Sequence, residues 1–307
     1  MNETMQSTFC HTYSVLFGLA VLTSDATCTW AEEFTYDSPY AHYIISQTGT
    51  VVEMRHLRKR THWLESAVDL KDPLRPVVPY TAAMFCGDFF KTPAKQVLMI
   101  GLGGGGFNRL FAAVYTQTTL QTVEIDPMAL ELAKKHMGFV ESDRSRVAIL
   151  DGRQYVKRTP EKWDWIILDA FHGGYVPFHL KTSEFYAQIR KALVPDGIMV
   201  SNLHSGTALY ESDVKTLLAS FPQVAIFHVP DRSNLIAVGT NYESPKLADQ
   251  WQRFSLDSAS PVLRKYVDLD VLRKNVVDRP ESETSKSAQV LTDDYSPAEY
   301  LNAFDRE

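Results

Sequence analysis

The chain of 307 residues lacks several features that define whole classes of protein. No uninterrupted apolar run reaches the roughly 18 residues that a membrane-spanning helix needs, so we expect no integral membrane span. Cysteine is scarce, and Cys10, Cys28 and Cys86 have no metal-like spacing, so we expect no metal site and read the three as free or buried thiols. A Cys10–Cys28 disulfide would require an ordered N-terminus in an oxidising compartment.

Positive charge is also in deficit. Lys and Arg number 31 against 37 Asp and Glu, which gives a formal charge of −6. A net acidic chain argues against a protein that grips a nucleic-acid backbone and is compatible with a cationic small molecule. We therefore expect a small-molecule amine or other nucleophile as partner and no nucleic acid, and leave a homodimer open.

The N-terminus has no Lys or Arg before Arg55. Ser14 to Thr23 is a short apolar run, and Ala31 is a candidate cleavage position, a pattern that resembles a secretory leader without its positive region. We interpret residues 1–33 as a leader or a disordered extension. The favoured location is cytoplasmic, and the alternative is export through an atypical leader that ends near Ala31.

The remaining sequence is typical of a globular α/β protein. Residues 34–88 are rich in β-formers, and a hairpin is expected around Gly49, so we predict a small N-terminal β-rich domain there. We read Arg55 to Arg60 as a solvated strand end or loop and Tyr80 to Phe90 as a helix. From residue 89 to 307, strands and helices alternate, which predicts a mostly parallel sheet covered by helices on both faces. The expected strands are 97–100, 120–124, 147–150, 164–168 and 197–203, and the expected helices are 107–115, 129–137, 153–157, 183–193 and 212–220.

The end of this alternation narrows the fold class. Strands are expected at 224–229 and 235–240, and the five residues between them cannot hold a crossover helix, so these strands must pair antiparallel. A nicotinamide-type Rossmann sheet is wholly parallel. A Rossmann-like parallel sheet with an antiparallel terminal hairpin is typical of class I AdoMet-dependent transferases.

Ligand-binding residue types follow the ends of the predicted parallel strands. Gly101 to Gly106 satisfies G-x-G-x-x-G between a strand and a helix, where glycine lets the backbone approach a nucleotide-like ligand. Glu124 ends the next strand, where a carboxylate can accept ribose hydroxyls, and Asp126 is a helix cap or a secondary contact. Asp151-Gly152 ends the third strand, where an acid can accept an adenine amino group, and Asp169 ends the fourth. These acids suit an adenosine that carries a sulfonium, so the expected co-substrate is S-adenosylmethionine or its decarboxylated form.

Together these features resemble the spermidine synthase (polyamine aminopropyltransferase) family, in its divergent spermidine synthase-like branch. The resemblance implies a small N-terminal β-domain on a Rossmann-like core, decarboxylated AdoMet as donor and methylthioadenosine as by-product. It places Glu124 at the ribose, Asp151 at the adenine, and Gly101 and Gly103 in the loop. The segments that carry it are Ser38-Pro39-Tyr40, Glu65 to Leu70 with Asp72-Pro73 and Tyr80, Val97 to Gly106, Val123 to Asp126, Asp151-Gly152, and Leu291 to Pro297.

Three positions depart from the family pattern. The family's glycine loop usually carries an Asp at the position of Gly104. Near the donor, the family has a Gln at the position that Glu65 occupies in this chain. The fourth strand of the family leads into Asp-Ser-Ser-Asp-Pro, whose second Asp orients and deprotonates the attacking amine. Here the run is Asp169-Ala170-Phe171-His172-Gly173, so His172 replaces that carboxylate.

The catalytic candidates are therefore Asp169 and His172, because an attacking amine needs a base or an acid-rich pocket. The nucleoside-binding candidates are Gly101, Gly103, Glu124, Asp126, Asp151 and Gly152. The candidates for substrate contact are Tyr40, Tyr80, Tyr175 and Asp294. Asp293-Asp294 is either a capping turn or a border of the acceptor pocket. Three functions remain open: aminopropyl transfer to a polyamine, AdoMet-dependent methyl transfer on the same core, and non-catalytic nucleoside binding.

Overall fold

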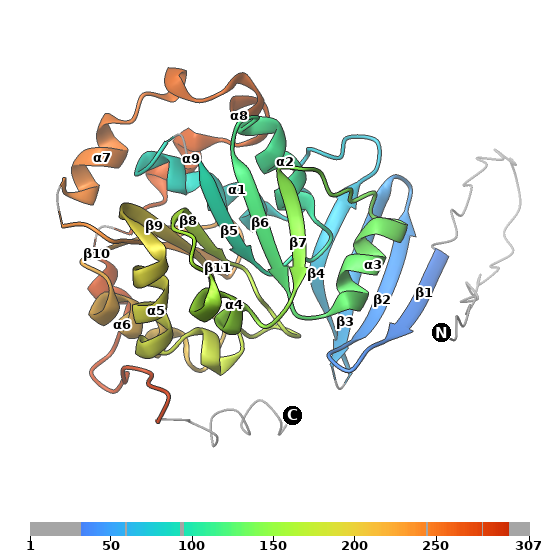
Figure 1. The fold of residues 1–307 in the computed structure, drawn as a ribbon, viewed down its shortest axis with the longest axis horizontal. Coiled ribbons are helices and arrows are strands. Elements are labelled where there is room, and N and C mark those ends of the chain that lie inside the picture. Colours follow the sequence, from blue (N-terminus) through green and yellow to red (C-terminus); the bar gives the residue numbers. More distant parts are fainter. Residues whose placement is uncertain (1–31, 59, 93–94, 244, 278, 295–307) are drawn as a thin grey trace, which may run out of the picture.

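The computed structural model describes residues 32–294, with the exception of 59, 93–94, 244 and 278 (Figure 1). Residues 1–31 of the predicted leader, the Cys10–Cys28 pair and residues 295–297 of the last motif lie outside the described residues. The predicted boundary at residue 33 is wrong, because Glu32 and Glu33 already belong to a β-strand. Within the described part, no helix combines the length and the apolar character that crossing a membrane requires.

An antiparallel sheet of four strands forms the N-terminal part of the chain, in the order β1-β2-β3-β4. The hairpin expected around Gly49 is confirmed: β2 and β3 pair antiparallel across that residue, whose φ of 60° lies in the left-handed region. A boundary between domains at residues 88 and 89 stays a prediction. The strands are β1 (Glu32–Asp37), β2 (His42–Thr48), β3 (Val51–Arg58) and β4 (Thr61–Asp69).

The central sheet has seven strands in the order β10-β11-β9-β8-β5-β6-β7. The five strands from β9 to β7 in this order pair parallel, whereas β11 pairs antiparallel with both β10 and β9, so the predicted terminal hairpin is confirmed. The largest boundary difference is at β9, which begins four residues before the predicted 197. The strands are β5 (Gln96–Ile100), β6 (Thr119–Glu124), β7 (Ser145–Ile149), β8 (Trp163–Leu168), β9 (Leu193–His204), β10 (Gln223–His228) and β11 (Asn234–Thr240).

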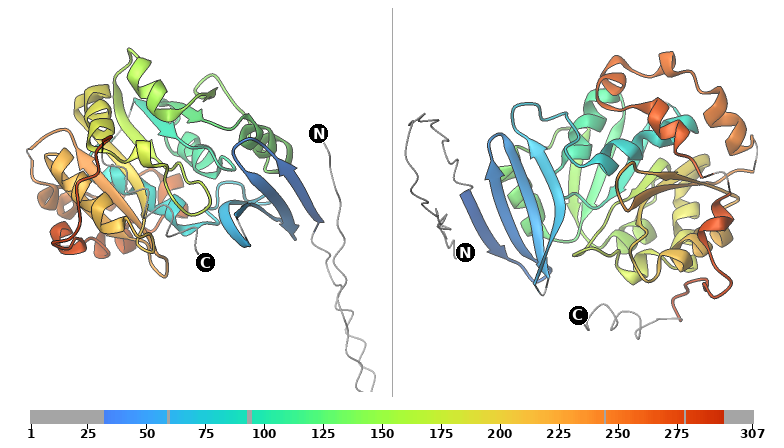
Figure 2. Two further views of the ribbon diagram at one scale, coloured as in Figure 1. Left: turned by 90° about the horizontal axis from the view of Figure 1, so that it is seen from below. Right: turned by 180° about the vertical axis from the view of Figure 1, so that it is seen from behind.

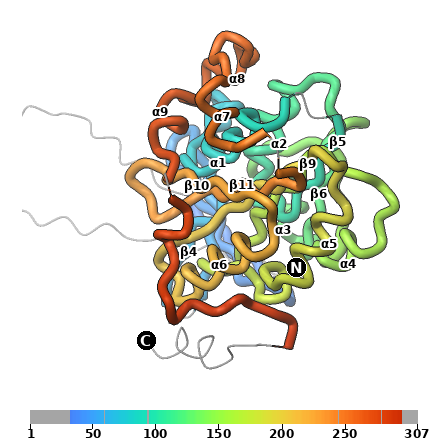
Figure 3. Tube along the Cα trace, turned by 90° about the vertical axis from the view of Figure 1, so that its left-hand side faces the viewer, coloured from blue at the N-terminus to red at the C-terminus, as the bar shows by residue number. Residues whose placement is uncertain are grey.

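Helices cover both faces of the central sheet, as Figures 1 and 2 show. One face packs against α1 (Pro79–Ala83), η1 (Met84–Phe89), α2 (Gly106–Val114), α7 (Leu247–Arg253), α8 (Pro261–Tyr266) and α9 (Leu269–Lys274). The other packs against α4 (Gly152–Arg158), η2 (Phe178–Leu180), α5 (Ser183–Ala192) and α6 (Tyr210–Ser220). Short turns η3 (Leu256–Ser258) and η4 (Pro280–Glu283) lie in the C-terminal segment, which is drawn orange to red in Figure 3.

The N-terminal sheet packs on α3 (Pro127–His136), the helix that follows β6. Val52 and Met54 of β3 are buried against Ala129 and Leu132 of α3. Because β6 and α3 belong to the central layer, this contact holds the N-terminal sheet beside the carboxyl ends of the parallel strands (Figure 1).

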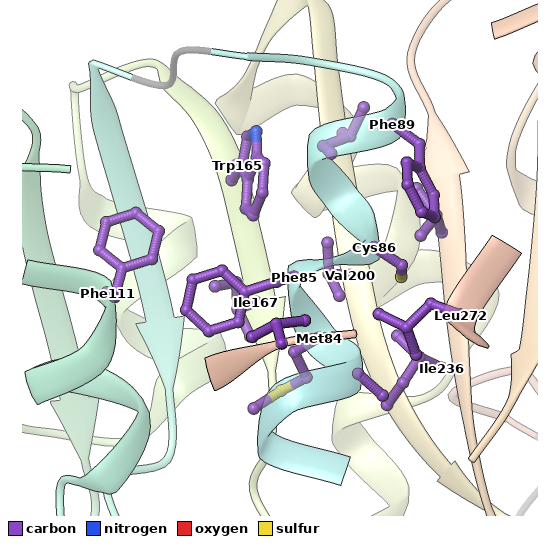
Figure 4. Close-up of a cluster of buried hydrophobic side chains, with 14 of the residues drawn as sticks. Met84, Phe85, Cys86, Phe89, Phe111, Trp165, Ile167, Val200, Ile236 and Leu272 are labelled. Carbon is purple, nitrogen blue, oxygen red and sulfur yellow. The ribbon is translucent and has the colours of Figure 1, made fainter. Parts of the chain in front are cut away.

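The helix predicted from Tyr80 to Phe90 is in fact a short α-helix followed by a 3₁₀ turn. In the turn, Met84, Phe85 and Cys86 are fully buried over β8, β9 and β11 (Figure 4). An ideal Cβ on Gly87 would lie 2.7 Å from the ring of Trp165, whose Nε1 donates a hydrogen bond to the Lys91 carbonyl at 3.0 Å. The indole is therefore fixed by its hydrogen bond to Lys91 and by its contact with Gly87. The absence of a side chain at Gly87 lets the 3₁₀ turn lie close to the sheet.

This packing predicts that Gly87→Ala destabilises the protein. The added methyl group would clash with the Trp165 ring, which its hydrogen bond to the Lys91 carbonyl holds in place. Overpacking of this kind costs about 1–3 kcal/mol. The matched control is Gly106→Ala, whose nearest neighbour would be an ordinary 3.8 Å away. Denaturant unfolding of both variants checks the prediction, and equal stabilities would contradict it.

Candidate active site

One cavity lies at the carboxyl ends of β5, β6 and β8, closed on the other side by β3, β4 and the segment before α1. It encloses about 1300 Å³ of open space, its mouth included. After β5 the chain builds β6 and β7 on one side and then crosses to β8 and β9 on the other. A cavity at such a switch point is where open α/β sheets bind their ligands.

The glycine loop forms the floor of the cavity and needs glycine for two separate reasons. At Gly101 the φ is 100°, and a Cβ would lie 2.2 Å from the carbonyl oxygen of Asp169, so no side chain fits between β5 and β8. Gly103 and Gly105 also have positive φ, and Gly105 directly precedes α2. Gly101 and Gly103 both line the cavity, as the sequence indicated.

Gly104 is closely packed against the side chains of Met137 and Ser66. A Cβ there would lie 2.4 Å from the Met137 sulfur and 2.9 Å from the Ser66 hydroxyl. Met137 is fully buried in the contact with the N-terminal sheet. An acid at this position would therefore require its neighbours to move, which gives a structural reason for the missing loop carboxylate.

Glu124 lies at the end of β6 with both carboxylate oxygens in use. Oε2 accepts the Leu102 amide at 3.0 Å and Oε1 accepts the Asp126 amide at 2.9 Å. Burial raises the pKa of this carboxyl, and the backbone amides oppose the shift. The side chain thus clamps the glycine loop to the start of α3 while it lines the cavity.

Asp126 is 1% exposed and caps α3 by accepting the Met128 amide at 2.9 Å. Its other oxygen accepts the Tyr43 hydroxyl at 2.7 Å and the hydroxyl of Ser38. Of the two roles that the sequence left open, the cap is therefore present, and it also ties the N-terminal sheet to α3. Asp126 still contributes to the cavity wall.

Asp151 and Gly152 stand at the start of α4 and also line the cavity. Asp151 Oδ1 accepts the Gln154 amide at 2.9 Å, and Oδ2 pairs with His179 Nε2 at 2.7 Å. The sequence did not indicate this partner. A Cβ at Gly152 would lie 2.4 Å from the Ile100 side chain, so glycine keeps α4 close to β5.

Asp169 is a buried carboxylate at the end of β8. Asn202 donates to its Oδ1 at 2.9 Å. The Tyr80 hydroxyl lies nearby and donates to the Glu65 carbonyl oxygen at 3.3 Å. Burial raises the pKa of Asp169 to about 6, although Asn202 and Tyr80 oppose the shift. The side chain is therefore largely ionised near neutral pH and can accept a proton.

Three side chains that the sequence did not predict to lie together line the cavity with Asp169: His56 of β3, Glu65 of β4 and His172 after β8. His56 Nδ1 lies 3.2 Å from Glu65 Oε1, without the geometry of a hydrogen bond, and the Gly173 amide donates to the same oxygen at 3.0 Å. The rings of His56 and His172 are 5.9 Å apart. All three side chains line the cavity.

These three groups are held uncharged near neutral pH. Burial, with the nearby carboxylates Asp169 and Glu124, raises the pKa of Glu65 to about 8 against the opposing Gly173 hydrogen bond. Burial, with the neighbouring His172, lowers the pKa of His56 to about 4. Burial, with Arg58 nearby, also lowers the pKa of His172.

The interpretation of residues 55–60 as solvated is wrong for His56, which is 9% exposed. Its side chain shares the buried face of β3 with Val52 and Met54, at a spacing of two residues. That alternation was visible in the sequence, but the surrounding basic residues concealed it.

The four substrate candidates are divided by the structure. Tyr40 and Tyr80 line the cavity, whereas Tyr175 borders a neighbouring hollow with the Arg58 guanidinium 4.5 Å above its ring. Asp294 is exposed and does not reach the cavity. Asp293 pairs with Arg153 at 2.6 Å and accepts the Thr182 hydroxyl, which anchors this segment to α4 and α5.

Among the described residues, no group of three His, Cys, Asp or Glu side chains is arranged to hold a metal ion. The site therefore offers carboxylates, imidazoles and backbone amides around one cavity. This arrangement can bind a nucleoside along the strand ends and accept a proton at Asp169.

Comparison with known proteins gives consistent results. The family described as "Spermine/spermidine synthase domain" matches residues 82–234. The polyamine aminopropyltransferase of Vibrio vulnificus is 30% identical over 73% of this chain and 75% of its own length. The fold resembles a probable spermidine synthase from Corynebacterium glutamicum, with a TM-score of 0.61, 20% identity, and coverage of 86% of this chain and 97% of that one. It also resembles human methyltransferase-like protein 13 in complex with SAH, with a TM-score of 0.51, 24% identity, and coverage of 64% and 91%.

The raised pKa of Glu65 predicts a pH dependence of stability that Glu65→Gln removes. The folded state holds a proton on Glu65 between its ordinary pKa of 4.5 and about 8, where the unfolded state has lost it. The stabilising contribution is therefore complete below pH 4.5 and is lost as the pH rises through about 8, by on the order of 2–4 kcal/mol.

Unfolding of the ligand-free protein by denaturant at pH 5 and pH 8.5 measures this difference. The control is Glu131→Gln, which removes an exposed carboxylate from α3. If the wild type and Glu65→Gln lose the same stability between the two pH values, Glu65 is not protonated in the folded protein.

Proposed function

The chain belongs to the spermine/spermidine synthase family, and we propose that it transfers an alkyl group, most simply aminopropyl, from an AdoMet-type donor to an amine. The observation that carries this proposal is the single cavity that gathers the glycine loop, Glu124, Asp151 and Asp169 from four consecutive strand ends. Each of these residue types suits one part of a sulfonium nucleoside.

The proposed donor lies along the strand ends. Glu124 accepts the ribose hydroxyls, Asp151 accepts the adenine amino group, and the glycine loop allows the backbone to approach the ligand closely. Support comes from the burial of Glu124 and from its amide hydrogen bonds, which fix the orientation of the carboxylate. The related fold that is described in complex with SAH uses the same chemical class of ligand.

The reaction is an in-line displacement. The lone pair of the attacking nitrogen forms a bond to the carbon next to the sulfonium, the carbon–sulfur bond breaks, and its electron pair stays on sulfur as a neutral thioether. The nitrogen then loses a proton, which we assign to Asp169. Its pKa near 6 and the hydrogen bond from Asn202 keep it ionised and oriented near neutral pH.

Methyl transfer from AdoMet is the second candidate, and Gly104 is the observation that favours it. The family usually carries an Asp at this position, and an acid here would require Met137 and Ser66 to move. Binding of both donors, measured in parallel, separates the two candidates.

Glu124→Ala is expected to weaken binding of the nucleoside by on the order of 1.5–3 kcal/mol, the range for hydrogen bonds to a charged group. Titration calorimetry with AdoMet and with decarboxylated AdoMet measures this loss and shows which donor binds more tightly. Glu131→Ala, on the exposed face of α3, is the control. Unchanged affinity in folded Glu124→Ala would remove Glu124 from the site, and no binding of either donor to the wild type would overturn the proposed function.

Turnover with putrescine is expected to be slow in the wild type and faster in His172→Asp, because the variant restores a carboxylate beside Asp169. Asp169→Asn should lower turnover by about 10²–10⁴-fold, the usual contribution of a general base. Wild-type activity should also fall as the pH drops through about 6, where Asp169 becomes protonated. Release of methylthioadenosine from decarboxylated AdoMet reports all three effects. If His172→Ala abolishes turnover and Asp169→Asn spares it, the proton goes to His172 instead.

A further inference from the structure

A second hollow lies next to the reactive end of the cavity. Glu65, Tyr80 and Phe171 line both spaces, so the two adjoin one another. The hollow extends from there between β4, the end of β9 and the turn that joins β10 to β11. Its further lining includes Trp63, Leu64, Gly174, Asn202, His204, Arg232 and Asn234.

Two amide side chains connect the hollow to the proposed base. Asn234 Nδ2 donates to the side-chain oxygen Oδ1 of Asn202 at 3.0 Å, and Asn202 Nδ2 donates to Asp169 Oδ1 at 2.9 Å. An acceptor whose amine reaches Asp169 and whose chain follows these amides has its far end at the β10–β11 turn, which carries Arg232.

The far end of the hollow offers no counter-charge for a second ammonium group. Glu65, at the junction with the cavity, is the only acid among the described residues that line the hollow. The adjoining hollow shares Trp63, Gly174 and His204 with it and adds Arg58 and Arg60, again without an acid among its described lining residues. An ammonium placed there would be repelled by the arginines and would have no paired carboxylate.

The same end is suited to an anion. Arg232 supplies a permanent positive charge and a planar set of donors that matches a carboxylate. His204 accepts the Gly206 amide at Nδ1, at 3.1 Å, and burial lowers its pKa, so in the neutral ring Nε2 carries the proton and can donate.

We propose that this hollow is the acceptor site and that it takes an amino carboxylate, with one amine at Asp169 and an anionic far end at Arg232, in preference to a diamine. The proposal rests on the proposed function, because Asp169 and the nucleoside define which end of the acceptor reacts. An anionic far end of the acceptor accounts for the position of Arg232, Arg58 and Arg60 beyond Glu65, where a polyamine site would require acidic residues.

The test compares three amines of equal chain length that differ only at the far end: 4-aminobutanoate, butylamine and putrescine. Each is titrated by calorimetry into the full chain, both free and saturated with methylthioadenosine. The expected order of affinity is 4-aminobutanoate, then butylamine, then putrescine. Arg232→Glu should weaken 4-aminobutanoate by about three- to tenfold, the effect of a partly exposed charge, and should strengthen putrescine.

Arg253→Glu is the matched control, because it makes the same charge change on an exposed position of α7 away from both hollows. It should leave the order and the affinities unchanged. Putrescine binding as tightly as 4-aminobutanoate, or equal effects of the two Arg variants, would overturn the acceptor proposal while methylthioadenosine still binds. Failure of methylthioadenosine to bind would instead count against the proposed function, and the titrations of the free protein would still rank the three amines.

Discussion

The buried carboxylate of Glu124 is the constraint on which the rest of the site depends. It joins the backbone that follows β5 to the backbone that follows β6, through the amides of Leu102 and Asp126. Asp126 in turn starts α3 and accepts hydroxyl groups from Ser38 and Tyr43 of the N-terminal sheet. One connected set of hydrogen bonds therefore positions the glycine loop, the first helix after β6 and the opposite wall of the cavity. These three parts of the cavity wall are therefore held in a fixed arrangement before a ligand binds.

The charges around this frame are distributed unevenly. On the proposed nucleoside side, Glu124 and Asp151 are satisfied by backbone amides, and Asp151 also by His179. On the proposed acceptor side, His56 is buried and Glu65 and His172 are partly buried, and their shifted pKa values keep all three neutral. A cation that binds next to Glu65 would lower the pKa of Glu65 and favour loss of its proton. The cavity can therefore gain a negative charge when a cationic ligand binds.

Much of this arrangement could be predicted because it depends on periodicity and on strand direction. Continuous buried runs marked the parallel strands, and parallel strands bring their carboxyl ends to one edge, so Gly101, Glu124, Asp151 and Asp169 could be placed together from spacing alone. Contacts between elements distant in sequence could not be predicted in this way. Tyr175 and Asp294 were candidates by residue type, but Arg58 and the Asp293–Arg153 pair place their segments outside the cavity. His56 was missed because a basic run concealed a strand alternation, and the helix from Tyr80 tightens into a 3₁₀ turn where Gly87 meets Trp165.

The departures from the family pattern are physically connected rather than independent. Gly104 packs against Met137 and Ser66, and Ser66 follows Glu65 along β4. The backbone carbonyl of Glu65 would lie 3.9 Å from a Cβ at Gly103, so β4 passes directly over the glycine loop. An acid at Gly104 would require Met137 and Ser66 to move, and the carboxylate of Glu65 enters the cavity from the opposite wall. Its oxygen is then held by the amide of Gly173, directly after His172, in the loop where the family carries its second carboxylate. The packing of Met137 and of Ser66 on β4 against the glycine loop thus disfavours an acid at Gly104, while β4 itself supplies the carboxylate of Glu65. It also couples the wall supplied by the N-terminal sheet to the loop that carries His172.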